Sequence, residues 1–304
     1  YPNRDKPDHL RPASFLPYKL ERECHTHDLW VFEGFTTYYE NVLPFRAGVL
    51  DEDKLLSLTS ARFNRVRERE GFHVESLSDA SFNAWTHLYK QTPDSAYCQA
   101  SYYGKGAVLA FMLDAALRKA GFSLDEVLKT WFHEALADPQ ARSLPDGGFF
   151  ERIPVASIAE RFKKLVTSSD RTLWENEWRC ALSTLGMSEE ADKNTPASRM
   201  HLGLQLDGLR VRYAESRGSA YAAGLFAGDE IIAVNGLRAD AATIERMITQ
   251  AKGSTLHIHY FREHLLRSAE IEVPVNPLPQ PGTLKIKSPT EFGRAWIRSS
   301  NRQA

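Results

Sequence analysis

Apolar residues recur every three to four positions through the first two-thirds of the chain, which is the spacing of one face of an α-helix. The first such run begins at Leu29, and Pro44 is expected to end it. Acidic first turns, basic last turns and capping residues predict further helices. They fall over 51–70, 101–120, 123–137, 155–166 and 171–185. This part of the chain is therefore predicted to be an α-helical array.

The pattern changes near Asn194, where short runs that alternate between apolar and polar residues replace the helical spacing. Asn235-Gly236 is a typical turn signal after one of these runs. Strands are predicted over 201–206, 209–213, 230–234, 255–261 and 269–273, with one helix over 241–251. The sequence thus predicts a multidomain α+β protein. A helical domain over 1–193 precedes a small β-rich module over 194–275, and residues 276–304 form a tail that packs back on the surface.

Charge and composition exclude several classes of protein. The 304 residues suffice for two domains, and 38 Lys and Arg residues balance 39 Asp and Glu residues. Without excess positive charge the chain is a poor candidate for binding nucleic acid or an anionic membrane surface. No apolar run approaches the roughly 20 residues of a membrane span. The cysteines Cys24, Cys98 and Cys180 are too far apart for a zinc ribbon, and we expect them to be buried.

Common catalytic motifs are missing. The sequence contains no G-x-S-x-G, Walker A or G-x-G-x-x-G motif, so it lacks the usual signals of serine hydrolases and nucleotide-binding proteins. His133-Glu134 is followed by Ala-Leu-Ala, and the zinc motif H-E-x-x-H is therefore absent as well.

Two patches remain as candidates for chemistry. Glu33 lies within a bulky apolar helix, and a buried carboxylate costs several kcal/mol unless a cation, a donor or a metal lies beside it. The alternative is an exposed glutamate near a helix N-terminus, or one paired with an arginine. Tyr102 and Tyr103 begin another helix beside Gly104 and Gly106, where they could also be simple packing residues.

Taken together, the two patches resemble a known family. The segments LWVFEGFTTYY (29–39) and YYGKGA (102–107), followed by an apolar helix with Asp114, resemble the glycyl aminopeptidases. These are PDZ-containing zinc peptidases of the gluzincin type, related to aminopeptidase N. Leu10-Arg-Pro12 and the helix start at 121–126 add to the resemblance, which covers nearly the whole chain.

This resemblance implies a gluzincin-like helical subdomain that holds a catalytic zinc. It makes Glu33 the third zinc ligand and Tyr103 the donor of a hydrogen bond to the tetrahedral oxyanion, although Tyr102 could be that donor instead. Lys105 and Gly106 match the family pattern and are given structural roles only. The implied activity is release of small N-terminal residues such as Gly or Ala from peptides, in the bacterial cytoplasm or periplasm.

The β-rich module resembles a PDZ domain, most specifically in the segment GDEIIAVNG (228–236). Such modules add an extended peptide to a sheet edge and bind its terminal carboxylate with loop amides. By resemblance, Leu202, Gly203 and Leu204 lie in that loop, and the helix over 241–251 forms the other wall of the groove. The alternative is a module that only packs on the catalytic domain.

The missing H-E-x-x-H motif leaves two hypotheses. An ungapped alignment places Asn3 where the family has its second zinc-binding histidine. His25 and His27 are expected to be exposed and not to replace it. Because the first methionine is Met112, we expect a C-terminal portion of a longer zinc aminopeptidase, itself inactive and without catalytic zinc. The alternative hypothesis is a non-catalytic peptide-binding or scaffolding protein with a degenerate peptidase fold.

Overall fold

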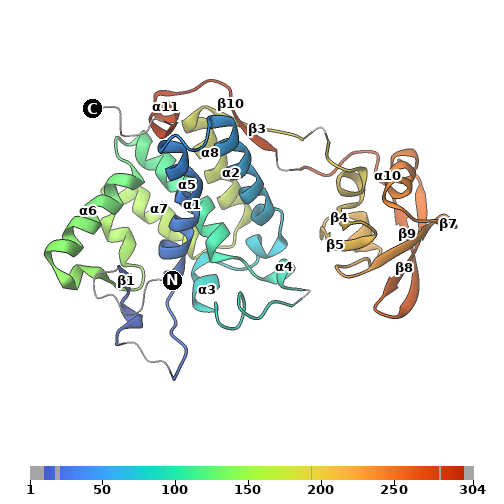
Figure 1. The fold of residues 1–304 in the computed structure, drawn as a ribbon, viewed down its shortest axis with the longest axis horizontal. Helices are drawn as coiled ribbons and strands as arrows, with labels where there is room; N and C mark the ends of the chain where they lie inside the picture. The colour runs from blue at the N-terminus through green and yellow to red at the C-terminus, as the bar shows by residue number, and fades with distance from the viewer. Residues whose placement is uncertain (1–9, 18–20, 93, 193, 281, 298–304) are drawn as a thin grey trace. The chain divides into compact units, whose positions relative to one another are not determined.

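A computed structural model describes residues 10–17, 21–92, 94–192, 194–280 and 282–297. The position of Asn3 lies outside these residues. The chain forms two compact units (Figure 1). Unit 1 comprises the residues up to 91, 98–190 and those from 283 onward, and unit 2 comprises 92–97 and 191–282. Helices and strands are both present, so the predicted α+β class is confirmed.

Unit 1 is a helical assembly around α5 (Tyr102–Lys119), which is buried along nearly its whole length. Twelve of its residues form an uninterrupted buried run, Gly104–Ala115, because the helix is mostly apolar and packs against neighbours all round. Those neighbours include α1 (Phe35–Arg46), α2 (Glu52–Arg67), α3 (Leu77–Phe82), α6 (Leu124–Ala137), α7 (Ala156–Val166) and α8 (Arg171–Leu185).

The first helical run differs from its prediction in two ways. Residues Trp30–Gly34 form a π-helical turn that continues directly into α1. Pro44 lies inside α1, which continues to Arg46, so the prediction that this proline ends the helix is wrong. A proline so close to the C-terminus of the helix removes one hydrogen bond and leaves the last turn intact.

The C-terminal segment returns to unit 1. Strand β10 (Thr283–Ile286) pairs antiparallel with β3 (Met187–Glu190), and the short helix α11 (Glu291–Ile297) follows. Trp296 of α11 is only 1% exposed, and its indole N–H donates a 2.6 Å hydrogen bond to the hydroxyl of Tyr38. This segment therefore contributes to the core of unit 1.

A buried polar cluster joins four parts of unit 1 around Asp114, which is fully buried near the middle of α5. Its carboxylate accepts hydrogen bonds from the hydroxyl of Tyr38 (2.9 Å), the guanidinium of Arg118 (3.1 Å) and the backbone N–H of Leu124 (2.9 Å). A buried charge with this many partners is held in place, because removing any one of them leaves polar atoms unsatisfied.

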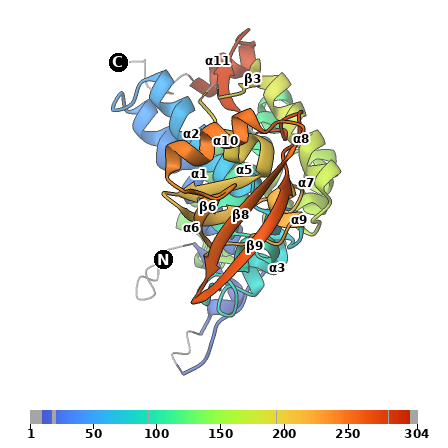
Figure 2. The same cartoon turned by 90° about the vertical axis from the view of Figure 1, so that its right-hand side faces the viewer.

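Unit 2 contains a mainly antiparallel sheet in the order β4-β5-β6-β8-β9, with β7 added to β6. The strands are β4 (Leu204–Asp207), β5 (Arg210–Ala214), β6 (Glu230–Val234), β7 (Leu237–Arg238), β8 (Thr255–Arg262) and β9 (Leu265–Glu272). The long β8–β9 hairpin is seen in Figure 2. Helices α9 (Ser219–Ala222) and α10 (Ala241–Gln250) complete the unit.

Two features of unit 2 were not predicted. Residues Ser198–Leu202 form a π-helical turn, so the strand expected from His201 begins only at Leu204. Tyr97, at the start of the segment leading to α5, belongs to this unit: its hydroxyl donates a 2.8 Å hydrogen bond to the carbonyl of Ala214, and its ring stacks on Tyr213.

The three cysteines do not behave as expected. Cys24 is half-buried, while Cys98 and Cys180 are exposed, so the prediction that all three are buried is wrong. In the part of the chain that the structure describes, none of the three takes part in a disulfide. Among the residues with assigned positions, no helix combines the length and apolar character that a membrane crossing requires.

Candidate active site

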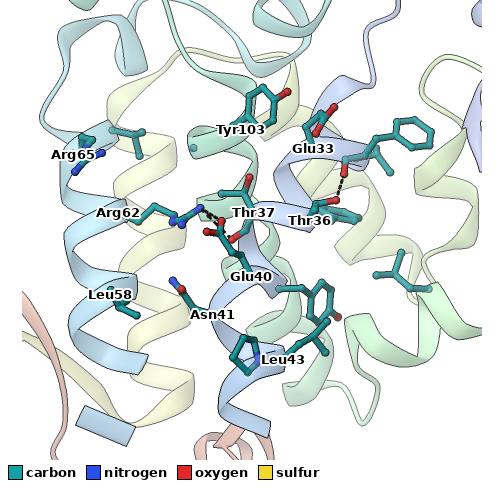
Figure 3. A pocket seen from close by; sticks show the side chains of 18 of the residues that line it. Glu33, Thr36, Thr37, Glu40, Asn41, Leu43, Leu58, Arg62, Arg65 and Tyr103 are labelled. Carbon is teal, nitrogen blue, oxygen red and sulfur yellow. Dashed lines mark hydrogen bonds and ion pairs between the residues drawn. The ribbon is translucent and has the colours of Figure 1, made fainter. Parts of the chain in front are cut away.

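Glu33 and Tyr103 line one pocket of about 1240 Å³ in unit 1 (Figure 3). One long wall of this pocket is formed by α1 and the π-helical turn before it, and α2 forms another. Residues from α5 and α6 complete it. Two residues that lie far apart in the sequence therefore face the same space. The lining is mostly apolar and includes Val31, Phe32, Phe35, Leu43, Pro44, Leu58, Val66, Leu128 and Trp131.

Glu33 lies in the π-helical turn and is half-buried. Within the described part of the chain, no hydrogen bond or ion pair involves its carboxylate. The nearby cation Arg62 instead pairs with Glu40, at 2.7 Å. π-Helical turns are rare, costly insertions into α-helices and occur frequently at functional sites. Glu33 is thus a carboxylate on an apolar wall with no partner among the described residues.

The two tyrosines of the second patch have different surroundings. Tyr103 is half-buried and lines the pocket. Tyr102 is only 1% exposed, does not line the pocket, and shares a 3.2 Å hydrogen bond with the hydroxyl of Tyr89. Burial and this hydrogen bond raise the pKa of Tyr102 well above its ordinary value. The two rings stack, with centroids 4.7 Å apart, so Tyr102 supports Tyr103 from the side.

Glycines bring the two patches together. A Cβ atom at Gly34 would lie 2.7 Å from the Cα of Gly106, and one at Gly106 would lie 2.9 Å from the Cα of Gly34. On the other side of α5, a Cβ at Gly104 would lie 2.3 Å from a methyl group of Val66. The turn carrying Glu33 and the helix carrying Tyr103 therefore touch backbone to backbone, which only glycine allows.

The start of the π-helical turn is fixed by Asp28. This buried carboxylate accepts a 2.6 Å hydrogen bond from the backbone N–H of Gly147. Burial raises the pKa of Asp28 to about 6, because the hydrogen bond from Gly147 offsets the desolvation only in part and the charge of Asp146 adds to the increase.

Polar residues of α1 and α2 also line the pocket and were not identified from the sequence. Thr37 and Glu40 follow Glu33 at helical spacing, and Arg62 and Arg65 follow one face of α2. The i, i+3 spacing of the arginines and the i, i+3/i+4 spacing after Glu33 were the available signals. Neither spacing indicates which helices face each other, so the sequence alone did not show that these polar residues of α1 and α2 line the same pocket.

The two histidines that could have replaced missing metal ligands are engaged elsewhere. The Nδ1 atom of His25 lies 2.9 Å from the carbonyl oxygen of Phe82, and that of His27 lies 3.0 Å from the hydroxyl of Ser78. The His27 ring also stacks on the Phe82 ring. Both histidines are half-buried, so the expectation that they are exposed is wrong. Neither lines the pocket with Glu33.

The residues present do not by themselves fit a zinc site. Among the positions that the structure describes, no three His, Cys, Asp or Glu side chains are grouped so that they could hold a metal. Glu33 could supply one carboxylate ligand, whereas a catalytic zinc takes three protein ligands.

In unit 2, the predicted peptide-binding residues lie at the end of the π-helical turn. Leu202 and Leu204 are buried in the core of the unit, and Gly203 between them has a φ of +76°. The backbone N–H of Gly203 donates to the carbonyls of Arg199 and Ser198. Leu204 begins strand β4, which lies at one end of the sheet.

Gly34→Ala tests the glycine contact. The added methyl group would force the two backbones apart, and overpacking of this kind typically costs about 1–3 kcal/mol. We expect urea unfolding monitored by circular dichroism to show a loss of stability in this range. Ser57→Ala, on an exposed position of α2, introduces the same side chain and should leave the stability nearly unchanged. Equal stability of the two variants would show that the contact is not tight.

Asp28→Asn tests the buried carboxylate. The pKa of Asp28 is about 6 in the folded protein, above its ordinary value of 3.8, so between these limits the unfolded state binds fewer protons and stability falls as pH rises. The loss should be roughly 2 kcal/mol between pH 4 and pH 7. Asparagine does not ionise, so the variant does not lose this stability as pH rises. The difference in unfolding free energy between the variant and the wild type should therefore shift in favour of the variant with increasing pH. Parallel stability profiles of the two proteins would contradict the assignment.

The chain is similar to known proteins over the segments that form this pocket. Residues 7–109 match the family model of the M61 glycyl aminopeptidases. Among solved structures, the crystal structure of an aminopeptidase N family protein from Idiomarina loihiensis has a TM-score of 0.79 and 28% sequence identity to the chain. That similarity covers 95% of this chain, which spans about half (51%) of the length of the matched protein.

A search of curated proteins found no match. The family model covers the segments of both Glu33 and Tyr103, and the structural similarity extends over both units. The two findings support the resemblance recognised in the sequence: residues 7–109 match the glycyl aminopeptidase family model, and the chain is similar to a solved aminopeptidase N family protein.

Proposed function

We propose that the chain carries part of the active site of a zinc-dependent aminopeptidase, in which Glu33 is a zinc ligand and Tyr103 a catalytic hydrogen-bond donor. This proposal rests on one observation: the carboxylate of Glu33, which has no partner among the described residues, lies in the same pocket as Tyr103. The match of residues 7–109 to a peptidase family supports it.

The surroundings of Glu33 call for a cation. A carboxylate on a largely apolar wall loses hydration, and this loss is normally compensated by a positive charge or by donors. The guanidinium of Arg62 is taken by Glu40, so no described residue provides the compensation. When bound, a catalytic zinc supplies a polarised water and a Lewis acid for the substrate carbonyl. Since Glu33 alone does not hold the metal, the proposal requires further ligands beyond the described residues.

Tyr103 is suited to stabilise a developing oxyanion. Its phenol faces the pocket at the same end as Glu33, as Figure 3 shows. A fixed hydroxyl donor is most effective where water is largely excluded and negative charge appears in the transition state. Tyr102 is a weaker candidate because its hydroxyl is committed to Tyr89 behind the pocket.

The substrate class follows from the family resemblance. We propose peptides with a small N-terminal residue, Gly or Ala, as substrates. The competing proposal is a non-catalytic peptide-binding protein with a degenerate peptidase fold, which is favoured by the lack of H-E-x-x-H in the sequence. The two differ in whether the full-length protein binds zinc stoichiometrically and hydrolyses peptides.

Substitutions of the two residues in the full-length protein should have separable effects. Glu33→Gln should lower both the zinc content and the aminopeptidase activity. Tyr103→Phe should keep the zinc but lower kcat by roughly 10²–10³, as for the loss of an oxyanion donor. Elemental analysis and hydrolysis of Gly- and Ala-containing peptides measure the two quantities.

Two control variants make the result specific. Glu160→Gln removes an exposed carboxylate on α7 and should change neither quantity. Tyr102→Phe removes the neighbouring hydroxyl and should lose much less activity than Tyr103→Phe. Full activity of Tyr103→Phe would overturn its role, and a wild-type protein without zinc or hydrolysis would favour the degenerate fold.

For unit 2 we propose peptide binding by strand addition, as in PDZ domains. Strand β4 is the terminal strand of the sheet and, among the described strands, is hydrogen-bonded only to β5. An extended peptide can pair with such an edge. Because the N–H of Gly203 already bonds within its own turn, we propose that strand pairing contributes more to affinity than binding of a terminal carboxylate by Leu202, Gly203 and Leu204.

Fluorescence anisotropy with the full chain tests this proposal. We expect labelled decapeptides with an apolar C-terminal residue to bind saturably, and amidation of the C-terminus to weaken binding by less than about threefold. A loss of tenfold or more on amidation would restore the carboxylate-binding loop as the main determinant. No binding of either form would mean that unit 2 serves only as a packing module.

A further inference from the structure

The side chain of Lys105 is fully buried, which is rare for lysine and calls for specific partners. Its ammonium group donates hydrogen bonds to the backbone carbonyls of Phe72 (2.6 Å) and Glu75 (2.7 Å). The same group lies 4.8 Å and 4.7 Å from the ring centroids of Phe72 and Trp174. Two carbonyl oxygens and two aromatic faces thus surround one amino group.

Lys105 and Tyr103 point in different directions from the same helix. Residues two positions apart in an α-helix differ by about 200° around its axis, so they lie on nearly opposite sides. Tyr103 lines the pocket, whereas Lys105 reaches the segment over 72–75 and does not line it. Lys105 therefore cannot touch a substrate in this pocket.

The segment that Lys105 binds also holds the chain before Tyr103. The carboxylate of Glu75 accepts a 2.7 Å hydrogen bond from the backbone N–H of Ala100 and pairs with His87 at 2.6 Å. A Cβ atom at Gly71 would lie only 2.1 Å from the carbonyl oxygen of Gln99, so these two backbones are in direct contact. Residues 71–75 thus contact the chain on both sides of Tyr103, at residues 99–100 before it and at Lys105 after it.

From these contacts we propose that Lys105 is a positioning residue for Tyr103, fixing the first turn of α5 so that the phenol points at the reacting carbonyl. The proposal rests on the catalytic role proposed for Tyr103. Under this proposal, the lysine of the YYGKGA segment (102–107) orients a catalytic side chain in addition to packing in the core. A displacement of about 1 Å at a catalytic group can cost on the order of 10² in rate, so a rigid support has a measurable value.

Lys105→Met tests the proposal because methionine preserves much of the side-chain volume but donates no hydrogen bond. In the full-length enzyme we expect kcat to fall about 10²-fold while KM changes by less than about twofold. In a Tyr103→Phe background, the same substitution should have almost no further effect on kcat. Effects that simply multiply would overturn the proposal, because Lys105 would then act independently of Tyr103.

A second measurement does not depend on activity. With tyrosine labelled by ¹³C at Cζ, the Tyr103 signal is assigned by its loss in Tyr103→Phe. We expect this signal to shift or broaden in Lys105→Met while that of Tyr39, another pocket tyrosine, stays unchanged. Trp296→Phe is the matched control, since it removes a different buried hydrogen bond of unit 1 and should leave the Tyr103 signal in place.

The outcomes separate the two proposals. An unchanged Tyr103 signal in folded Lys105→Met, verified by circular dichroism below its melting temperature, would overturn the positioning role whatever the activity. Full activity of Tyr103→Phe would instead overturn the proposed catalytic role of Tyr103. A shifted signal together with a kcat loss that disappears in the Tyr103→Phe background supports both.

Discussion

The backbone contact between Gly34 and Gly106 is the constraint on which the candidate site depends. It brings the π-helical turn and the first turn of α5 closer than any side chain would allow. Glu33 immediately precedes one glycine, and Tyr103 lies three residues before the other. Their presence in one pocket is therefore a direct result of helix packing at glycine, and the local chemistry of either residue adds nothing to it.

Around this contact, unit 1 combines an apolar centre with a few fully engaged polar groups. Lys105 joins α5 to the segment over 72–75 near one end, and Asp114 joins it to α1 and to the start of α6 further along. Such buried polar groups are costly unless satisfied, so they favour one arrangement of the helices over others that would bury the same apolar area. The same rigidity keeps the pocket walls in place.

Regular elements were predictable from the sequence because their signals are local. Helical spacing and caps located α5 and α8 to within a residue or so, and alternation located β6. The two π-helical turns were not predictable, since an inserted residue depends on what the turn packs against. The same holds for the lining of the pocket by α2: the face of Arg62 and Arg65 is visible in the sequence, but its partner helix is set by tertiary contacts.

Candidate residues were predictable to a different degree. Glu33 and Tyr103 stood out only through family resemblance. The structure distinguishes Tyr103 from Tyr102 by burial, by the lining of the pocket and by the hydrogen bond between Tyr102 and Tyr89. The role of Lys105 could not be read from the sequence. A lysine in an apolar helix gives no indication of which carbonyl oxygens will surround it, because those belong to a segment some thirty residues away.

The pairing of β3 with β10 determines how most of unit 2 is connected to unit 1. Glu190 and Thr283 are register partners, so the chain leaves unit 1 and re-enters it at neighbouring points of one two-stranded ribbon. Residues 191–282 are in effect a very long hairpin loop. Replacing this loop would remove most of unit 2 but leave the segment over 92–97, which belongs to the same unit, without its partners; a simple truncation would also remove the last helix from the core of unit 1.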